Sequence, residues 1–160
     1  LLQLHMPIAA NEPGGSLHDK LSHLGAEVLA DGLKLARIGA HFQAVQQLAE
    51  GMTYAKKIEK HEAILDWQQS AKQLADKVRA FNPWPVAETE LDGERVRIYQ
   101  ARALPGPAGD AAPGTCVAAS KAGIDIACGE GVLRLLSIQR DGGRVLSAAD
   151  YLNARPLKTP

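Results

Sequence analysis

The spacing of apolar residues changes from helical to alternating close to Pro85. Upstream of this point, apolar residues recur at steps of three and four, for example Leu17, Leu21, Leu24 and Val28, which places them on one face of a helix. Downstream, apolar and polar residues alternate, which is the period of a half-buried strand. The change of period predicts a helical part followed by a part built of strands.

Five short runs in the second part have the alternation of strands, at residues 86–91, 94–103, 114–119, 124–128 and 132–139. Asp92-Gly93 separates the first two runs and is a strong hairpin signal. A loop rich in Pro and Gly, residues 104–113, separates the second run from the third. Short strands around one long loop predict a small five-stranded OB-like β-barrel.

Residues 1–8 also alternate and are expected to form a strand. Ser16 with Asp19 has the form of a capping box, so a helix should begin there and continue to about Ile38. A strand followed by a long amphipathic helix is typical of the last unit of a parallel α/β sheet. Because the chain opens inside the strand pattern and without an initiator Met, we expect a fragment whose residues 1–8 expose an apolar edge.

Residues 39–69 show weak periodicity and are interpreted as a linker over the surface. Ser70 and Gln73 have the capping-box spacing at the start of another helix, which Pro83 stops. Ser147 is expected to cap a short closing helix.

Composition limits the functions that the chain can have. Lys+Arg and Asp+Glu are 18 each, so any contact with nucleic acid must use local basic patches. Aromatic residues make up 4%, which is low for a protein that stacks successive bases. Neither a membrane span nor a signal peptide is expected. Cys116 and Cys128 lie in strand-like runs and are interpreted as small packing residues, which fits a cytoplasmic protein.

The chain offers no catalytic constellation. His61-Glu62 begins like a zinc-protease helix, but Leu65 stands where the second histidine ligand would be. The stretch 129–131 (Gly-Glu-Gly) is too short for a phosphate loop and is interpreted as a turn. The histidines lack metal-ligand spacing, so no metal site is expected.

The basic residues say more about function than the candidate catalytic and metal-binding residues do. In the run 94–103, Arg95, Arg97 and Tyr99 alternate with Val96 and Ile98, so the arginines and the tyrosine should face outward. Paired arginines beside an aromatic ring suit contacts with RNA phosphates and bases. The alternative is that they are ordinary solvated charges, because several glutamates lie close in the sequence.

Several stretches, taken in order, resemble the C-terminal portion of methionyl-tRNA formyltransferases. The most recognisable is Arg79-Ala80-Phe81-Asn82-Pro83-Trp84-Pro85, and the others are residues 15–26, 53–58, 64–67, 91–94, 112–115, 127–131 and 147–153. The resemblance implies the end of a Rossmann-like catalytic domain at residues 1–38, a linker at 39–69, and an OB-like tRNA-binding domain with a leading helix at 70–160.

The resemblance also implies a function. The family transfers a formyl group from its co-substrate, 10-formyltetrahydrofolate, to the amino group of methionine on initiator tRNA, in the cytoplasm and as a monomer. Its catalytic Asn, His and Asp lie in the N-terminal domain, before the point that matches Leu1. We therefore expect these 160 residues to bind no cofactor and to be inactive alone.

The tRNA-binding candidates are the basic residues of the linker, helix and barrel, namely Lys56, Lys57, Lys60, Arg79, Arg95, Arg97, Arg140 and Arg144. The alternative is a non-catalytic bracing or interaction domain of another formyl-folate enzyme. Salt-sensitive binding of tRNA would separate the two hypotheses.

Overall fold

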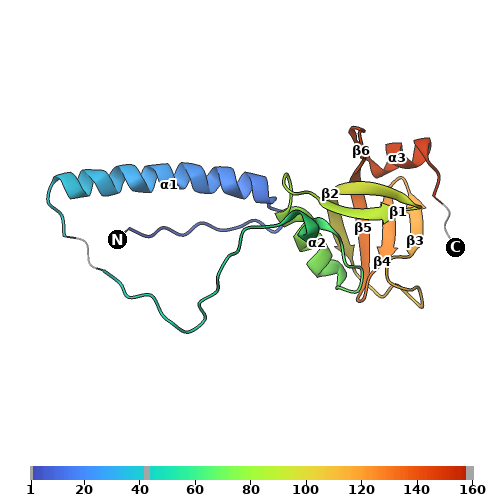
Figure 1. Cartoon of the computed structure of the whole chain (residues 1–160), viewed down its shortest axis with the longest axis horizontal. Coiled ribbons are helices and arrows are strands. Elements are labelled where there is room, and N and C mark those ends of the chain that lie inside the picture. The colour runs from blue at the N-terminus through green and yellow to red at the C-terminus, as the bar shows by residue number, and fades with distance from the viewer. Residues whose placement is uncertain (1, 42–43, 158–160) are drawn as a thin grey trace. The chain divides into compact units, whose positions relative to one another are not determined.

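The computed structural model describes residues 2–41 and 44–157. Contacts divide the chain into two compact units, Leu1–Lys57 and Ile58–Pro160, which we call the N-terminal and C-terminal units (Figure 1). The boundaries expected at residues 38 and 69 stay predictions. Within the described ranges, no helix combines the length and the apolar character needed to cross a bilayer.

The regular element of the N-terminal unit is the helix α1 (Gly14–Arg37), which confirms the predicted helix but begins earlier. Its N-cap is Pro13, without a side-chain cap. The capping box predicted at Ser16 is wrong, because the Ser16 hydroxyl turns back to the Glu12 carboxylate and to the Pro13 carbonyl, 3.2 Å away.

The strand predicted at residues 1–8 is absent from the described residues 2–8, and residue 1 lies outside the description. Leu4 and Ile8 are 59% and 61% exposed. A strand is held by hydrogen bonds to a neighbouring strand, and residues 2–8 have none in the described part of the chain. The predicted helix is confirmed, but the expectation of a Rossmann-like strand–helix remnant is not.

The C-terminal unit is built around an antiparallel sheet of six strands. In chain order they are β1 (Ala87–Leu91), β2 (Glu94–Leu104), β3 (Cys116–Ser120), β4 (Gly123–Ala127), β5 (Val132–Arg140) and β6 (Val145–Ser147). Their spatial order is β1-β2-β5-β4-β3, with β6 beside β5 (Figure 1). The five predicted strands are confirmed within a few residues.

The prediction of a five-stranded OB-like barrel is not confirmed, because the sheet is open and has a sixth strand. Closure would require β1 to pair with β3, and the described residues form no such pair. The free edge of β1 is met instead by the preceding chain: Ile64 forms a parallel bridge with Glu88, and the Leu65 N–H donates to the Glu88 carbonyl at 2.9 Å. The strand β6 was not predicted, because three residues are too few to show an alternation of apolar and polar residues.

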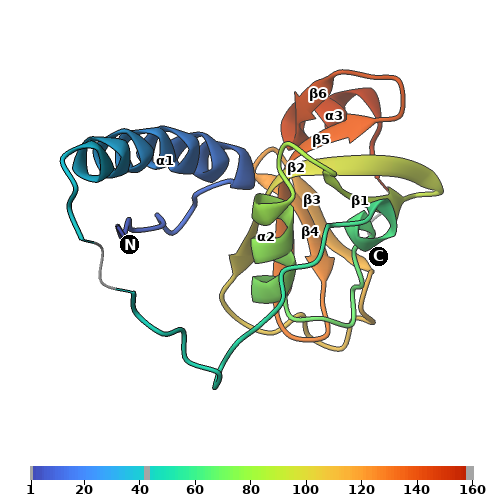
Figure 2. The ribbon, with the colours of Figure 1, turned by 60° about the vertical axis from the view of Figure 1, so that its left-hand side comes forward.

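Two capped helices complete the C-terminal unit, and Figure 2 shows α2 beside the sheet. α2 (Ala71–Ala80) begins at the predicted capping box, where Ser70 and Gln73 bond reciprocally. Its Leu74 and Val78 are buried in the same core as the aliphatic residues of β2, β4 and β5. α3 (Ala148–Ala154) begins at Ser147, whose hydroxyl accepts the Asp150 N–H at 3.1 Å, as predicted.

The segment between the short 3-10 helix η1 (Lys60–Ala63) and α2 is fixed to the turn that joins β4 to β5. The Gly129 N–H donates to the carbonyls of Trp67 and Gln69 at 2.8 and 3.0 Å. The Ala71 N–H donates to the Glu130 carbonyl at 2.8 Å. This turn therefore positions the start of α2, which agrees with the interpretation of residues 129–131 as a turn.

Candidate nucleic-acid interface

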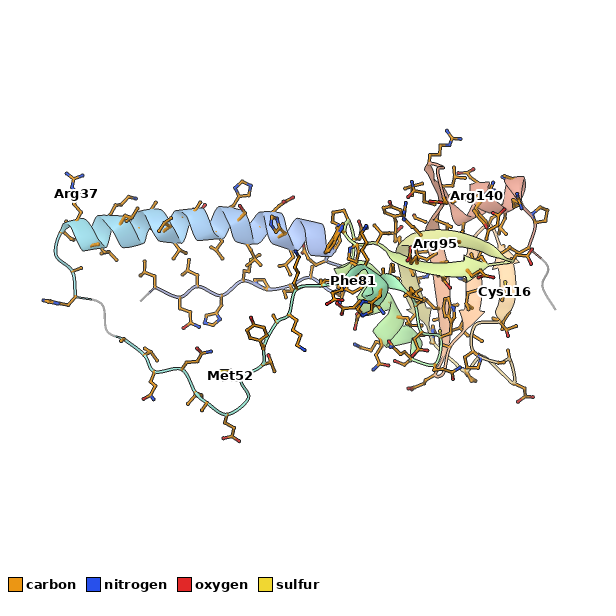
Figure 3. All side chains as sticks on the ribbon, in the orientation of Figure 1. Arg37, Met52, Phe81, Arg95, Cys116 and Arg140 are labelled. Carbon is orange, nitrogen blue, oxygen red and sulfur yellow. The ribbon has the colours of Figure 1, made fainter. Side chains whose placement is uncertain are left out.

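The alternation along β2 separates a core face from an outward face, as predicted. Val96 and Ile98 are fully buried. Arg95, Arg97 and Tyr99 lie on the opposite face, and Figure 3 labels Arg95 on β2. The sheet thus presents cations and a phenol on its outer surface, and the value of each cation for a ligand depends on its partners within the fold.

Arg95 is held by Glu88 of the neighbouring strand β1. The Arg95 Nε and Nη2 atoms donate to Glu88 Oε2 at 2.9 and 2.6 Å. The Glu88 side chain is 12% exposed, and its carboxylate raises the pKa of Arg95 above the ordinary value. Because the carboxylate and the guanidinium neutralise one another, Arg95 contributes little free charge to the surface.

Arg140 and Arg79 also have acidic partners. Arg140, which Figure 3 labels, lies at the end of β5. It donates from Nη2 to Glu94 at 3.1 Å, and Arg155 reaches the same carboxylate at 2.8 Å. Arg79 lies on α2 and pairs with Asp76 at 2.9 Å. These ion pairs fit the solvated-charge alternative better than the binding hypothesis.

Arg97 differs from these three, since no ion pair or hydrogen bond joins its side chain to another described residue. Its neighbours across the sheet are Glu88, whose carboxylate already holds Arg95, and Gln139 of β5. Gln139 accepts a hydrogen bond from the Tyr99 hydroxyl at 2.9 Å and donates to the Gly143 carbonyl at 2.7 Å. Arg97 therefore lies beside the neutral bonds of Tyr99 and Gln139, and its charge is not paired with that of another described residue.

The remaining candidates are exposed and have no ion pair among the described residues. Lys56 and Lys57 end the N-terminal unit, and Lys60 begins η1 in the C-terminal unit. Arg144 lies in the turn between β5 and β6. Their role in binding stays a prediction.

Two arginines on the outward face were missed by the sequence reasoning. Arg102 of β2 lies directly opposite Arg134 of β5. Arg134 donates from Nε and Nη2 to the two carboxylate oxygens of Asp125 on β4, both at 2.6 Å. Arg102 lies inside the predicted strand. The pairing of β2 with β5 shifts its register after Ile98, so the alternation of faces seen up to Tyr99 does not predict which face Arg102 occupies.

The described residues offer little for catalysis or metal binding. They contain no group of three or more His, Cys, Asp or Glu side chains that could hold a metal ion. Both cysteines are free, Cys128 is buried, and burial raises the pKa of each thiol, which disfavours the nucleophilic thiolate. These properties fit the interpretation of the cysteines as packing residues.

The comparisons with known proteins agree with one another. Residues 57–156 match the family described as "Formyl transferase, C-terminal domain". The chain is 58% identical over 155 residues to methionyl-tRNA formyltransferases of Stenotrophomonas maltophilia and of Xanthomonas campestris pv. campestris. These matches cover 97% of this chain and 50% of each relative, so the chain spans about half the length of these relatives.

Among solved structures, the fold is similar to HypX from Aquifex aeolicus in complex with tetrahydrofolic acid. The TM-score is 0.66 at 17% identity, and the match covers 97% of this chain and 28% of that chain. A HypX variant matches with a TM-score of 0.58. At this identity the likeness concerns the fold alone.

Proposed function

Since the chain belongs to the formyl transferase C-terminal domain family, which confirms the resemblance in its sequence, we propose that it is the tRNA-contacting part of a methionyl-tRNA formyltransferase. The names of the 58% identical relatives support this function. The complete enzyme would use 10-formyltetrahydrofolate to formylate methionine on initiator tRNA. It would act in the cytoplasm and as a monomer.

One observation supports the tRNA-binding role most directly. The outward face of β2 carries Arg97 without an acidic partner among the described residues, beside the hydroxyl of Tyr99 and the amide of Gln139. Guanidinium groups bind phosphate oxygens, and the second N–H of the Gln139 amide is left to donate to a phosphate or sugar oxygen. Such contacts hold and orient a folded RNA without reading its sequence.

The proposal also divides the work of the enzyme. Formyl transfer needs a neutral amine, a group that accepts its proton and donors that polarise the formyl carbonyl. By the family resemblance, those groups belong to the catalytic Asn, His and Asp outside these 160 residues. Spaced cations such as Arg97, Lys57 and Lys60 would hold the tRNA body while the catalytic groups act at its acceptor end.

The test is the salt dependence of binding between the full chain and initiator methionyl-tRNA. Arg97→Gln should weaken binding and lower the slope of log affinity against log salt by about one. The double variant Lys57→Gln/Lys60→Gln should lower this slope by more than Arg97→Gln does, because it removes two cations. The matched control is Arg95→Gln with Glu88→Gln, which removes a cation but leaves the net charge unchanged, and should leave the slope unchanged.

Two outcomes would contradict the proposal. Binding that is absent at low salt would favour the bracing or interaction domain of another formyl-folate enzyme. Binding that is present but equally reduced in the control would mean that the position of the cation is unimportant, contrary to the role given to Arg97.

A further inference from the structure

Arg102 and Arg134, which we call the arginine pair, lie opposite one another on the outward face of the sheet. They are direct partners in the register of β2 and β5. Leu133 and Leu135, which flank Arg134 on β5, are fully buried, so Arg134 lies on the side away from the core. Arg102 lies on the same side, because residues directly opposite one another in a sheet share a face. Like charges directly opposite one another destabilise a sheet, so this arrangement needs compensation.

The fold compensates one of the two charges. Asp125 lies opposite Arg134 on β4 and accepts two hydrogen bonds from it, both of 2.6 Å. The carboxylate raises the pKa of Arg134, and the Asp125 side chain is 9% exposed. Across the three side chains, two positive charges face one negative charge, so one positive charge remains.

The same contacts hold Arg134 in place. Its aliphatic stem crosses Gly123, where a Cβ atom would lie 2.4 Å from the Arg134 Cγ atom. A larger residue at position 123 would displace the stem, so the glycine allows the guanidinium to lie flat toward Asp125. Arg134 uses Nε and Nη2 for this bond, and a guanidinium has five N–H donors, so donors remain for a second acceptor.

Arg102 is exposed, and within the described ranges its side chain takes part in no hydrogen bond or ion pair. We propose that the arginine pair binds one phosphodiester of the tRNA backbone, with Arg102 as the exposed donor and Arg134 as the donor held in place by Asp125. This inference rests on the proposed function. A phosphodiester carries one negative charge, which equals the charge left over by the pair and Asp125, and its two free oxygens suit paired guanidinium groups.

The position of the pair supports this assignment. Arg97 lies on the same strand five residues before Arg102, which corresponds to about 16 Å along β2. A tRNA that contacts Arg97 can therefore contact the pair at a second, separate phosphate. Two contacts on one rigid sheet would fix the direction of the backbone, which a single contact cannot do.

The test uses the full chain, initiator methionyl-tRNA and a series of salt concentrations. Arg102→Gln should reduce affinity about two- to fivefold, the range of an exposed ion pair, and lower the salt slope by about one. Arg102→Lys should keep most of the salt slope, because the charge remains. Its affinity should lie between those of Arg102→Gln and the unaltered chain, since lysine cannot bind two phosphate oxygens with a planar guanidinium. Arg134→Gln is combined with Asp125→Asn so that no buried carboxylate is left unpaired.

The double variant should lose a similar share of affinity although its net charge is unchanged, which a purely long-range attraction would not produce. Arg95 is paired in the same way but lies opposite Glu90, whereas Arg134 lies opposite a second arginine, so the effect is expected only at Arg134. If this variant does not fold by circular dichroism, the exposed Arg102 variants decide the question. Unchanged affinity and slope in Arg102→Gln, with normal binding by the unaltered chain, would overturn this inference alone. Failure of the unaltered chain to bind tRNA would overturn the proposed function as well.

Discussion

At the scale of single residues, Glu12 of the N-terminal unit receives hydrogen bonds from two other side chains. Its carboxylate accepts hydrogen bonds from Lys20, at 2.6 Å, and from the hydroxyl of Ser16. These bonds, that of Lys20 first and that of Ser16 second, lower the pKa of Glu12 below the ordinary glutamate value. The contact ties the chain before α1 to side chains of the first two turns of the helix.

This contact should make the start of α1 sensitive to acid. The folded pKa lies below the unfolded one, so the contribution to stability is complete above the ordinary glutamate value and is lost as the pH falls through the folded value. Hydrogen exchange of the amides of the second turn, from Leu17 onward, should accelerate across this interval, beyond the intrinsic dependence on pH. Glu12→Gln should remove the extra acceleration, and Glu27→Gln on the same helix should not. Identical profiles for the two variants would contradict the role of Glu12.

At the scale of elements, the connection between β4 and β5 decides where α2 begins. Gly129 lies so close to the preceding segment that a Cβ atom would be 1.9 Å from the Gln68 carbonyl oxygen. Because that neighbour is backbone, it cannot rotate away as a side chain could. The closeness allows the Gly129 N–H to bond to Trp67 and Gln69, and Trp67 in turn donates from Nε1 to Thr89 at 3.1 Å.

Gly129→Ala should therefore destabilise the C-terminal unit by roughly 3 kcal/mol or slightly less, at the upper end of the cost of overpacking. The measurement is urea unfolding of the full chain, followed by Trp fluorescence. Gly143→Ala is the matched control, since the nearest atom to its added Cβ is 3.4 Å away and its φ lies outside the range that favours glycine. If Gly129→Ala destabilised the unit as little as Gly143→Ala, the backbone around Gln68 would be able to move away from the added Cβ atom with little loss of free energy.

At the scale of the whole molecule, the buried core belongs to the C-terminal unit. α1 contributes no buried residue, whereas Leu65, ahead of α2, is 4% exposed and packs with the residues of the sheet. The segment before α2 is therefore part of the packed unit and not only a connection.

A chain that begins at Ile58 should unfold cooperatively, with a melting temperature within a few degrees of that of the 160-residue chain, because it keeps the whole core. A chain that begins at Ala71 loses Leu65 and the Trp67 contacts, and should be less stable by about 2–5 kcal/mol, the cost of removing a buried leucine. Calorimetry of both chains makes the comparison. Equal melting temperatures for the two would contradict the assignment of residues 58–70 to the core.

Local chemistry was predictable where neighbours in sequence are also neighbours in space. Ser70 with Gln73, Ser147 with Asp150 and the Asp92-Gly93 hairpin form as expected because each depends on a few consecutive residues. The outward position of Arg95 and Arg97 follows in the same way from the period of a strand. Ser16 did not cap its helix, since Glu12 and Lys20, four residues to either side, together provide a competing contact.

The sequence by itself determined the helical and stranded parts, the faces of β2 and, through its ordered motifs, the family. Only the tertiary structure decided which arginines of the strands are neutralised, because Glu88, Glu94 and Asp125 reach them across neighbouring strands or along a diagonal. It also decided that the sheet stays open, since the edge of β1 is met by residues 64–65 instead of β3. Pairing between strands depends on register and on which segments compete for an edge, and a pattern read along one strand contains neither.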